Sequence, residues 1–184
     1  MISFKAQKID NVSVMQMIEG GNSYGPKKTS FVELKPYSEA DKETLEGLSK
    51  NWSFWGDAFV DTILQDFDNY YTDRVYDKQF FALTTQNCNH TRLNPYEVLG
   101  IVQARKMSKN KCYIDYIQTA PDTAYGAPVR AYKKVGKAML DVLKKYYKGV
   151  EIRLYSVASA IDFYKKNGFK MVGDSKYMVF KPRV

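Results

Sequence analysis

The amino-acid sequence predicts a mixed α/β (α+β) fold, in which a central mixed sheet is covered by helices on both faces. Segments with alternating or continuous apolar residues, typical of strands, are interspersed with segments that have apolar residues every three or four positions, typical of helices. Their order is strand, two helices, three strands, helix, strand, helix and a last strand pair. With 184 residues, of which 45% are hydrophobic, the chain is long enough for one domain with a real core.

The first thirty residues predict an appendage to this fold. Residues 2–9 and 12–18 alternate loosely in polarity around Asp10-Asn11, which favours a hairpin, and a Gly/Ser/Pro-rich link follows. We therefore expect an N-terminal extension over residues 1–30 and the main domain over residues 31–184.

Two helices are expected near the start of the main domain. Ser38, followed three residues later by Asp41, predicts the start of a helix that continues to residue 52. A second helix, over residues 55–71, has Phe59, Ile63 and Phe67 at four-residue spacing, which predicts an apolar stripe.

The other elements follow from apolar pattern and turn residues. They are strands at 31–37, 79–85, 97–107, 111–121 and 150–157, a helix at 135–148, a short helix that contains Tyr164, and a strand pair within 169–182.

The cysteines and the hydropathy predict a soluble, cytoplasmic protein. Cys88 and Cys112 lie far apart without a Cys-x-x-Cys pair, so we expect neither a disulfide framework nor a metal site. No apolar run approaches the roughly 18 to 20 residues that a membrane span requires.

Charge is unevenly distributed along the chain. Residues 1–100 hold 10 Lys/Arg and 14 Asp/Glu, whereas residues 101–184 hold 18 and 6, so the two parts carry −4 and +12. This asymmetry suggests that the C-terminal part meets an anion, either a nucleic acid or a phosphate-bearing cofactor, or that the charge serves solubility alone.

The segment "AIDFYKKNGF", residues 160–169, predicts a short helix with defined ends. Ser159 and Asp162 form a potential capping box, and Gly168 is a left-handed stop after which Phe169 folds back as an apolar seal. Tyr164 is either a core residue with a satisfied hydroxyl or a proton donor.

An acid interrupts the otherwise apolar strand "CYIDYIQTAP". Strict alternation places Tyr113, Asp115, Ile117 and Thr119 on one face and Ile114, Tyr116 and Gln118 on the other. Asp115 is either a catalytic base or a structural acid that lies at an edge or is hydrogen-bonded.

These segments, in this order, resemble the GNAT (Gcn5-related) acyl-CoA N-acyltransferase superfamily over about residues 31–182. The family motif Phe-Tyr-x-x-x-Gly-Phe is matched by Phe163, Tyr164, Gly168 and Phe169. The resemblance implies that an amine attacks acetyl-CoA directly, without a metal, that Tyr164 protonates the departing thiolate, and that Asp115 takes the proton of the acceptor ammonium.

The resemblance also implies a binding site for acetyl-CoA at the start of the helix over residues 135–148. In the family pattern Gln/Arg-x-x-Gly-x-Gly/Ala, Gly136 matches the second glycine, Lys134 stands at the first, and Ala131 stands where Gln or Arg is expected. Lys134 either adds charge near phosphate or obstructs it, and Arg130 contacts either the phosphates or the acceptor. Val157 stands where the family often has asparagine. The implied contacts are Ile117, Gln118 and Thr119 through their backbone, and Arg130, Lys133, Lys134, Val135, Gly136, Lys137, Ala138 and Ser159.

The acceptor is expected beside the first two helices. Trp52, Trp55 and Asp57 offer aromatic faces and a carboxylate for a cationic amine, such as a polyamine, an aminoglycoside or a peptide lysine. Aminoacyl-tRNA is a possible but less favoured acceptor, and a binding module without turnover is the non-enzymatic alternative. The N-terminal hairpin either mediates a homodimer or covers the acceptor, and His90 lacks a nucleophile partner.

Overall fold

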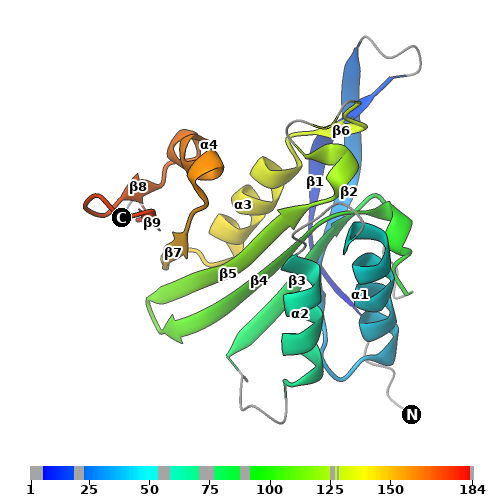
Figure 1. Cartoon of the computed structure of the whole chain (residues 1–184), viewed down its shortest axis with the longest axis horizontal. Helices are drawn as coiled ribbons and strands as arrows, with labels where there is room; N and C mark the ends of the chain where they lie inside the picture. The colour runs from blue at the N-terminus through cyan, green and yellow to red at the C-terminus, as the bar shows by residue number, and fades with distance from the viewer. Residues whose placement is uncertain are drawn as a thin grey trace.

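One nine-stranded sheet, in the strand order β6-β1-β2-β3-β4-β5-β7-β9-β8, connects the whole molecule (Figure 1). The structure is a computed structural model, and it describes residues 6–18, 23–53, 59–70, 77–87, 92–124, 127 and 129–182. Neighbouring strands pair antiparallel except β5 and β7, which are parallel. The mixed α/β class predicted from the sequence is confirmed.

The strands are β1 (Gln7–Met17), β2 (Tyr24–Leu34), β3 (Lys78–Thr84), β4 (Val98–Ser108), β5 (Lys111–Thr119), β6 (Tyr132–Lys133), β7 (Glu151–Tyr155), β8 (Lys170–Met171) and β9 (Tyr177–Phe180). The helices are α1 (Glu39–Trp52), α2 (Phe59–Asp68), α3 (Val135–Tyr146) and α4 (Ile161–Lys166). Short 3₁₀ turns span Pro95–Glu97, Pro121–Thr123 and Ala158–Ala160.

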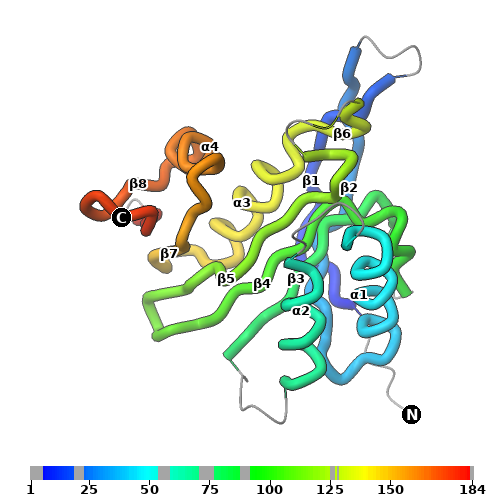
Figure 2. Tube along the Cα trace, viewed as in Figure 1, coloured from blue at the N-terminus to red at the C-terminus, as the bar shows by residue number. Residues whose placement is uncertain are grey.

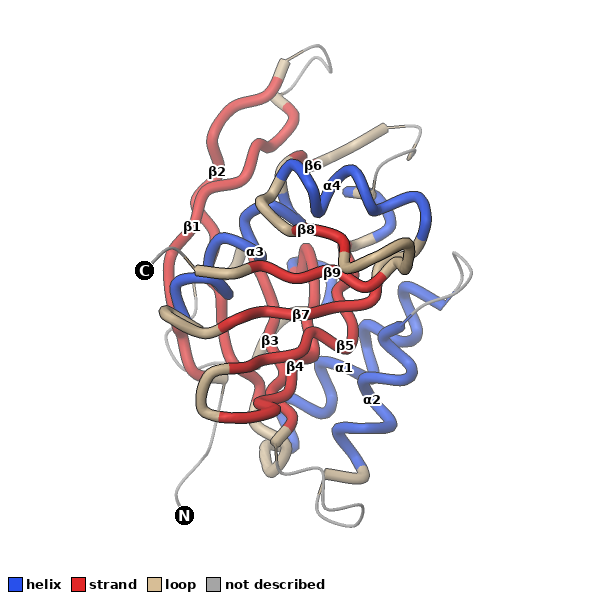
Figure 3. The backbone as a smooth tube through the Cα atoms, turned by 90° about the vertical axis from the view of Figure 1, so that its left-hand side faces the viewer, coloured by secondary structure: helices blue, strands red, loops and turns tan. Residues whose placement is uncertain are grey.

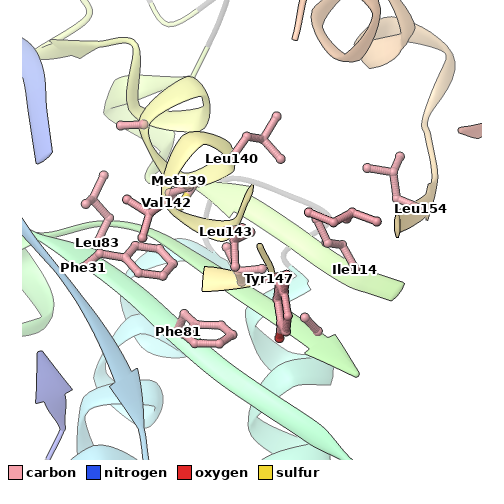
Figure 4. Close-up of a cluster of buried hydrophobic side chains, with 14 of the residues drawn as sticks. Phe31, Phe81, Leu83, Ile114, Met139, Leu140, Val142, Leu143, Tyr147 and Leu154 are labelled. Atoms are coloured by element: carbon pink, nitrogen blue, oxygen red, sulfur yellow. The ribbon is translucent and has the colours of Figure 1, made fainter. Parts of the chain in front are cut away.

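Helices cover both faces of the sheet, as the sequence predicts. Helices α3 and α4 pack on one face over a core that includes Phe31, Phe81, Met139 and Leu143, which we call the first core (Figure 4). Helices α1 and α2 pack on the other face over the second core, around Leu45 and the residues of β2 to β4 that face it (Figure 3). Among the described residues, no helix is both long and apolar enough to cross a membrane.

The N-terminal strand differs from its prediction. Residues 7–17 form one continuous strand, and the chain reverses only after it, where the Ile18 N–H donates to the Ser23 carbonyl at 2.9 Å. The predicted turn at Asp10-Asn11 is therefore wrong. A register shift between Lys8 and Asp10 absorbs the irregularity, and the Asp10 carboxylate pairs with Lys145 of α3 at 2.8 Å. The expected domain boundary at residue 30 falls inside β2.

The start of α1 follows its prediction and contains a buried acid. The Ser38 side chain accepts a hydrogen bond from the Asp41 N–H at 3.3 Å, and the Asp41 carboxylate accepts one from the Lys35 N–H at 2.9 Å. Asp41 is only 1% exposed, and burial raises its pKa from 3.8 to about 6.

Asp41 should therefore make stability depend on pH. Between its unfolded pKa of 3.8 and its folded pKa of about 6, the folded protein binds the extra proton, so stability falls as pH rises through this window. The contribution is on the order of 3 kcal/mol. We expect Asp41→Asn to gain stability relative to the wild type as pH rises from about 4 to about 7, measured by urea unfolding. The exposed Asp174→Asn controls for adding an amide, and a constant difference between Asp41→Asn and the wild type across this range would contradict the prediction.

Candidate functional site

Strand β5 loses its neighbour halfway along its length. It pairs with β7 at only four positions, residues 111–114 against 151–154. β5 continues to Thr119 with β4 beside it, whereas β7 ends at Tyr155. Within the described part of the chain, residues 115–119 have a partner strand on one side only. We call these five residues the free edge of β5.

The backbone groups of the free edge alternate in direction. The Ala120 N–H donates to the Leu99 carbonyl of β4 at 2.8 Å. Because hydrogen bonds alternate along an antiparallel pair, the Gln118 backbone also faces β4, whereas the N–H and C=O groups of Ile117 and Thr119 face away from it. Two of the three residues expected to offer backbone groups to a ligand therefore have those groups on the unpaired side.

A bulge at Asp115 rearranges the faces of β5. Ile114 and Ile117 both pack against the first core, whereas Tyr116 packs against the second. The register of β4 with β5 shifts at this point, because Asp115 is an extra residue without a direct partner. The predicted grouping of Asp115 with Ile117, based on strict alternation, is wrong.

Asp115 lies in a nearly enclosed polar cluster on the α2 side of the sheet. Its Oδ1 atom is 3.1 Å from the Arg105 Nε atom. Gln103 donates from Nε2 to Asp66 of α2 at 2.7 Å. Within the described residues, the Asp115 Oδ2 and Gln103 Oε1 atoms are both enclosed and have no hydrogen-bond partner. Burial raises the pKa of the Asp115 carboxyl, while Arg105 opposes the rise.

Helix α3 begins at a residue with a left-handed backbone. Lys134, its N-cap, has φ 64° and ψ 13° and is the one non-glycine residue with positive φ in the ranges that the structure describes. The N–H groups of Val135, Gly136 and Lys137 precede the first intrahelical bond, from Ala138 to Lys134, and have no partner among the described residues. Three free donors at the positive end of a helix suit an anion.

The left-handed backbone explains the imperfect motif at this position. Lys134 stands where the family pattern has a glycine, and it adopts the conformation for which glycine is usually chosen. Its side chain makes no capping hydrogen bond and is exposed. The turn therefore keeps a glycine-like backbone although its residue is lysine.

Gly136 lies in close contact with the Phe163 side chain of α4. A Cβ atom at this position would lie 3.1 Å from the Cζ atom of Phe163. The start of α3 and the helix that carries Tyr164 are therefore in close contact, and the glycine permits it.

The N-terminal hairpin holds the loop that precedes α3. β1 pairs with β6, and the Met17 N–H donates to the Ala131 carbonyl at 2.8 Å (Figure 2). The Tyr24 hydroxyl donates to the Arg130 carbonyl at 2.8 Å, and the Lys133 Nζ atom lies 3.6 Å from the centre of the Tyr24 ring. The hairpin thus contacts two of the cations expected at the cofactor, Arg130 and Lys133 of β6.

Helix α4 ends as predicted. Gly168 has φ 84°, the Phe169 N–H donates to the Tyr164 carbonyl at 3.1 Å, and the Gly168 N–H donates to the Lys165 carbonyl at 3.0 Å. This is the Schellman arrangement. The Phe169 ring is buried and lies 5.6 Å from the Tyr164 ring, centre to centre. The predicted stop and apolar seal are confirmed.

The Tyr164 ring is buried, but its hydroxyl makes no hydrogen bond with the described residues. The residue is 7% exposed, and burial raises its pKa to about 12. Its hydroxyl has no hydrogen-bond partner in the described structure and is not among the fully enclosed polar atoms. A buried tyrosine usually has a partner for its hydroxyl, so this one is free to contact a ligand.

The start of α4 differs from its prediction. A 3₁₀ turn over Ala158–Ala160 precedes the helix, and the N-cap is Ala160 without a side-chain hydrogen bond. The predicted capping box of Ser159 and Asp162 is wrong, because Ser159 is an exposed part of that turn. The hydroxyl of the buried Ser156 donates to the Val157 carbonyl at 2.8 Å.

The expected acceptor residues are only partly described. Trp55 and Asp57 lie outside the described residues, as do Cys88 and His90. Trp52 is 5% exposed and packs in the second core. The α2 side of the free edge instead presents Phe59, which is 38% exposed and lies 5.2 Å from the Tyr116 ring, centre to centre.

The site residues that were missed from the sequence include Gln103 and Tyr24. Gln103 interrupts the apolar run of β4, and this polar residue inside a buried strand is a signal that could have been used. Tyr24 gives no such signal, because its contacts with Arg130 and Lys133 join segments far apart in the chain.

Lys134 gives a test of the left-handed turn. A β-branched side chain is poorly tolerated at positive φ, so we expect Lys134→Val to lower the free energy of unfolding by about 1 to 2 kcal/mol. Lys134→Gly should be tolerated within about 0.5 kcal/mol, because glycine's backbone preference offsets its unfolded-state entropy. Chemical denaturation measures both. Lys137→Val, in the first turn of the same helix, is the matched control; an equal loss at both positions would contradict a special backbone at Lys134.

Comparisons with known proteins agree on the fold. Neither family models nor curated proteins match this sequence. Among solved structures, a Desulfovibrio desulfuricans protein assigned to the GNAT family of acetyltransferases is 11% identical, with a TM-score of 0.55 over 82% of this chain and 94% of that one. Ard1 from Thermoplasma volcanium is 16% identical, with a TM-score of 0.54 over 85% and 99%.

Gcn5 from Tetrahymena matches a larger share of this chain. It is 12% identical, with a TM-score of 0.51 over 94% of this chain and 99% of its own. At these identities the likeness concerns the fold. The order of elements, the parting of β5 from β7 and the three structural matches together show that this chain has the fold of the GNAT acetyltransferases.

Proposed function

We propose that this protein is an acyl-CoA-dependent N-acetyltransferase that moves an acetyl group to a primary amine by direct attack. The observation that carries the proposal is the free edge of β5. Backbone groups of Ile117 and Thr119 there, and the first three N–H groups of α3, have no partner among the residues that the structure describes. Such a combination suits a long ligand with amide groups at one end and phosphates at the other.

The residues present fit acetyl-CoA. The free edge would pair with the amides of the pantetheine arm, and the N–H groups of Val135, Gly136 and Lys137 would receive the pyrophosphate. Lys133 and Arg130 lie on the loop that enters this helix, so their charges add to the attraction. Acetyl-CoA supplies the activated acetyl group as a thioester.

Tyr164 is the residue that we assign to the leaving sulfur. With a pKa raised to about 12 by burial, it remains protonated at neutral pH. A thiol has a pKa near 8.5, so complete proton transfer from this phenol to a thiolate is unfavourable. Tyr164 therefore acts by donating a hydrogen bond as charge develops on sulfur, and the final proton comes from solvent.

Asp115 is the base of the proposal, acting through water. Its Oδ2 atom is enclosed and its Oδ1 atom faces Arg105, so it does not meet the amine directly. It lies across the sheet from Tyr164, which packs in the first core. An amine at the free edge would then have its proton acceptor on one face and the hydrogen-bond donor to sulfur on the other.

The acceptor that fits this side is a cationic amine on a small molecule or a peptide. Phe59 and Tyr116 offer aromatic surface beside the free edge, and Asp66 and Asp115 place carboxyl groups behind it. Aromatic faces and carboxylates both attract an ammonium group.

The first test is a calorimetric titration with acetyl-CoA, with ATP at matched concentration as a control for indiscriminate attraction to basic residues. We expect saturable binding of acetyl-CoA and no comparable binding of ATP. Absent or equal binding would sink the proposed cofactor site. Turnover is then measured as thiol release with a panel of primary amines.

Removing the Tyr164 hydroxyl should affect turnover more than binding. We expect Tyr164→Phe to lower kcat by about 100-fold while KM for acetyl-CoA changes less than about threefold, because the interaction forms only as sulfur gains charge. Tyr147→Phe is the matched control, since it removes a buried hydroxyl that donates to Gln79 at 2.7 Å, away from the proposed chemistry. Equal losses in both variants would contradict a catalytic role for Tyr164.

Asp115 should shape the pH profile. If it receives the amine proton, kcat/KM rises with pH through its raised pKa, and Asp115→Asn should remove this rise and lower the plateau by about 100-fold. Asp66→Asn changes a neighbouring acid of the same cluster without removing the proposed base. A profile that Asp115→Asn leaves intact would exclude Asp115 as the base.

A further inference from the structure

In the described part of the chain, no helix covers one face of part of the sheet. In β4, β5, β7 and β9, the residues that point into the first core include Ala104, Cys112, Ile114, Ile152, Leu154 and Met178. The residues that alternate with these along the same strands point to the opposite face of the sheet, the face on which α1 and α2 lie. Among the described residues, the second core takes no residue from β7, β8 or β9. In Figure 3 these strands lie to one side of α1 and α2.

Arginine and tyrosine alternate across this uncovered surface. Arg105 of β4 is opposite Tyr113 of β5, which is opposite Arg153 of β7, and Tyr155 of β7 is opposite Tyr177 of β9. We call the surface of these five residues the outer sheet face. It joins four strands that are adjacent in the sheet.

The side chains of the outer sheet face support one another. The Arg105 guanidinium lies 5.1 Å from the centre of the Tyr113 ring. The Tyr113 and Tyr177 rings are 6.4 Å apart, centre to centre, and inclined by 23°. Arg153 donates to the Tyr177 hydroxyl at 3.1 Å. These contacts hold the rings in place without burying them in a core.

These contacts within the outer sheet face do not involve its most exposed tyrosine, Tyr155, or the lysines beside it. Tyr155 is 64% exposed at the end of β7, where no core residue needs it. Lys111 and Lys170 are exposed on the same face, since they pair in register with Glu151 and Val179. The two acids nearby, Glu151 and Asp115, are already engaged by Arg153 and Arg105. The lysines therefore remain as surplus positive charge among the described residues.

A large hollow adjoins the outer sheet face. It has a volume of about 1110 Å³ and is lined by Arg153 and Tyr177 together with Lys144, Lys148, Lys170 and Lys181. An anionic polymer that crossed the tyrosines would meet these cations next. The surface thus combines the exposed Tyr155 ring and the partly exposed Tyr177 ring with several lysines, of which Lys144 already donates to the Asn167 carbonyl at 2.7 Å, and with one acid, Glu151, that Arg153 engages.

We propose that the outer sheet face binds single-stranded nucleic acid. Unpaired bases stack on Tyr155 and Tyr177, and the phosphates contact Lys170, Lys181 and Lys148. A single strand is favoured over a duplex because only unpaired bases present their flat faces to the rings. It is favoured over an acidic protein because the tyrosines offer stacking that carboxylates cannot use. This binding site does not depend on acetyl transfer.

The experiment measures fluorescence anisotropy of labelled oligouridylate and oligodeoxythymidylate of about 20 nucleotides, with inorganic polyphosphate as a polyanion without bases. We expect Tyr155→Leu and Tyr177→Leu each to weaken oligonucleotide binding by about tenfold and to leave polyphosphate binding unchanged. We expect Lys170→Gln with Lys181→Gln to reduce the salt dependence, by about 0.7 in log Kd per log salt for each phosphate that is no longer neutralised. A preference for the RNA or the DNA strand identifies the natural class.

Matched controls lie elsewhere on the surface. Tyr96→Leu removes a tyrosine that is 83% exposed, and Lys28→Gln with Lys50→Gln makes the same change in charge. Tyr155→Leu alters an exposed side chain, so it remains informative if Tyr177→Leu fails to fold. The proposal is overturned if polyphosphate binds as tightly as the oligonucleotides, if the tyrosine variants match their control, or if saturating acetyl-CoA abolishes oligonucleotide binding.

Discussion

The four-residue pairing of β5 with β7 is the constraint on which the candidate site depends. β7 is only five residues long and pairs with β5 over four of them, so β5 continues to Thr119 beyond the last paired residues, 114 and 154. Beyond that point the bulge at Asp115 turns the backbone, and β5 keeps β4 as its one neighbour among the described strands. Backbone groups that lack a partner strand must bind solvent or a ligand. The register of β5 with β7 therefore determines where the candidate site lies.

The start of α3 shows that backbone conformation and residue identity can be separated. A glycine pattern is usually treated as the requirement for a phosphate-binding turn, but the physical requirement is the left-handed backbone and the free N–H groups that follow it. Lys134 meets the first and leaves the second intact. The closest approach at this helix start is at Gly136, where a Cβ atom would lie 3.1 Å from the Phe163 ring of α4.

Local signals in the sequence predicted local structure well. Ser38 and Asp41 predicted the start of α1, and Gly168 with Phe169 predicted the end of α4, because each feature is decided by residues within one turn. Features that depend on distant contacts were missed. Asp10-Asn11 has the sequence of a turn, but Asp10 pairs with Lys145 of α3 within a continuous strand. The apolar alternation of β5 is regular in the sequence, but its pairing with β4 contains a bulge at Asp115. The positions of Tyr164 and Gly136 followed from motifs, whereas Gln103, Tyr24 and the outer sheet face require knowledge of which surfaces the helices leave open.

The N-terminal hairpin contacts the residues that lead into α3. The Tyr24 hydroxyl holds the Arg130 carbonyl, 106 residues later in the chain, and β1 supplies the strand on which β6 forms. Residues 130–133, before α3, are therefore held by the β1–β2 hairpin, which is synthesised first. A change in the length of this hairpin would therefore displace residues 130–133, and with them the start of α3.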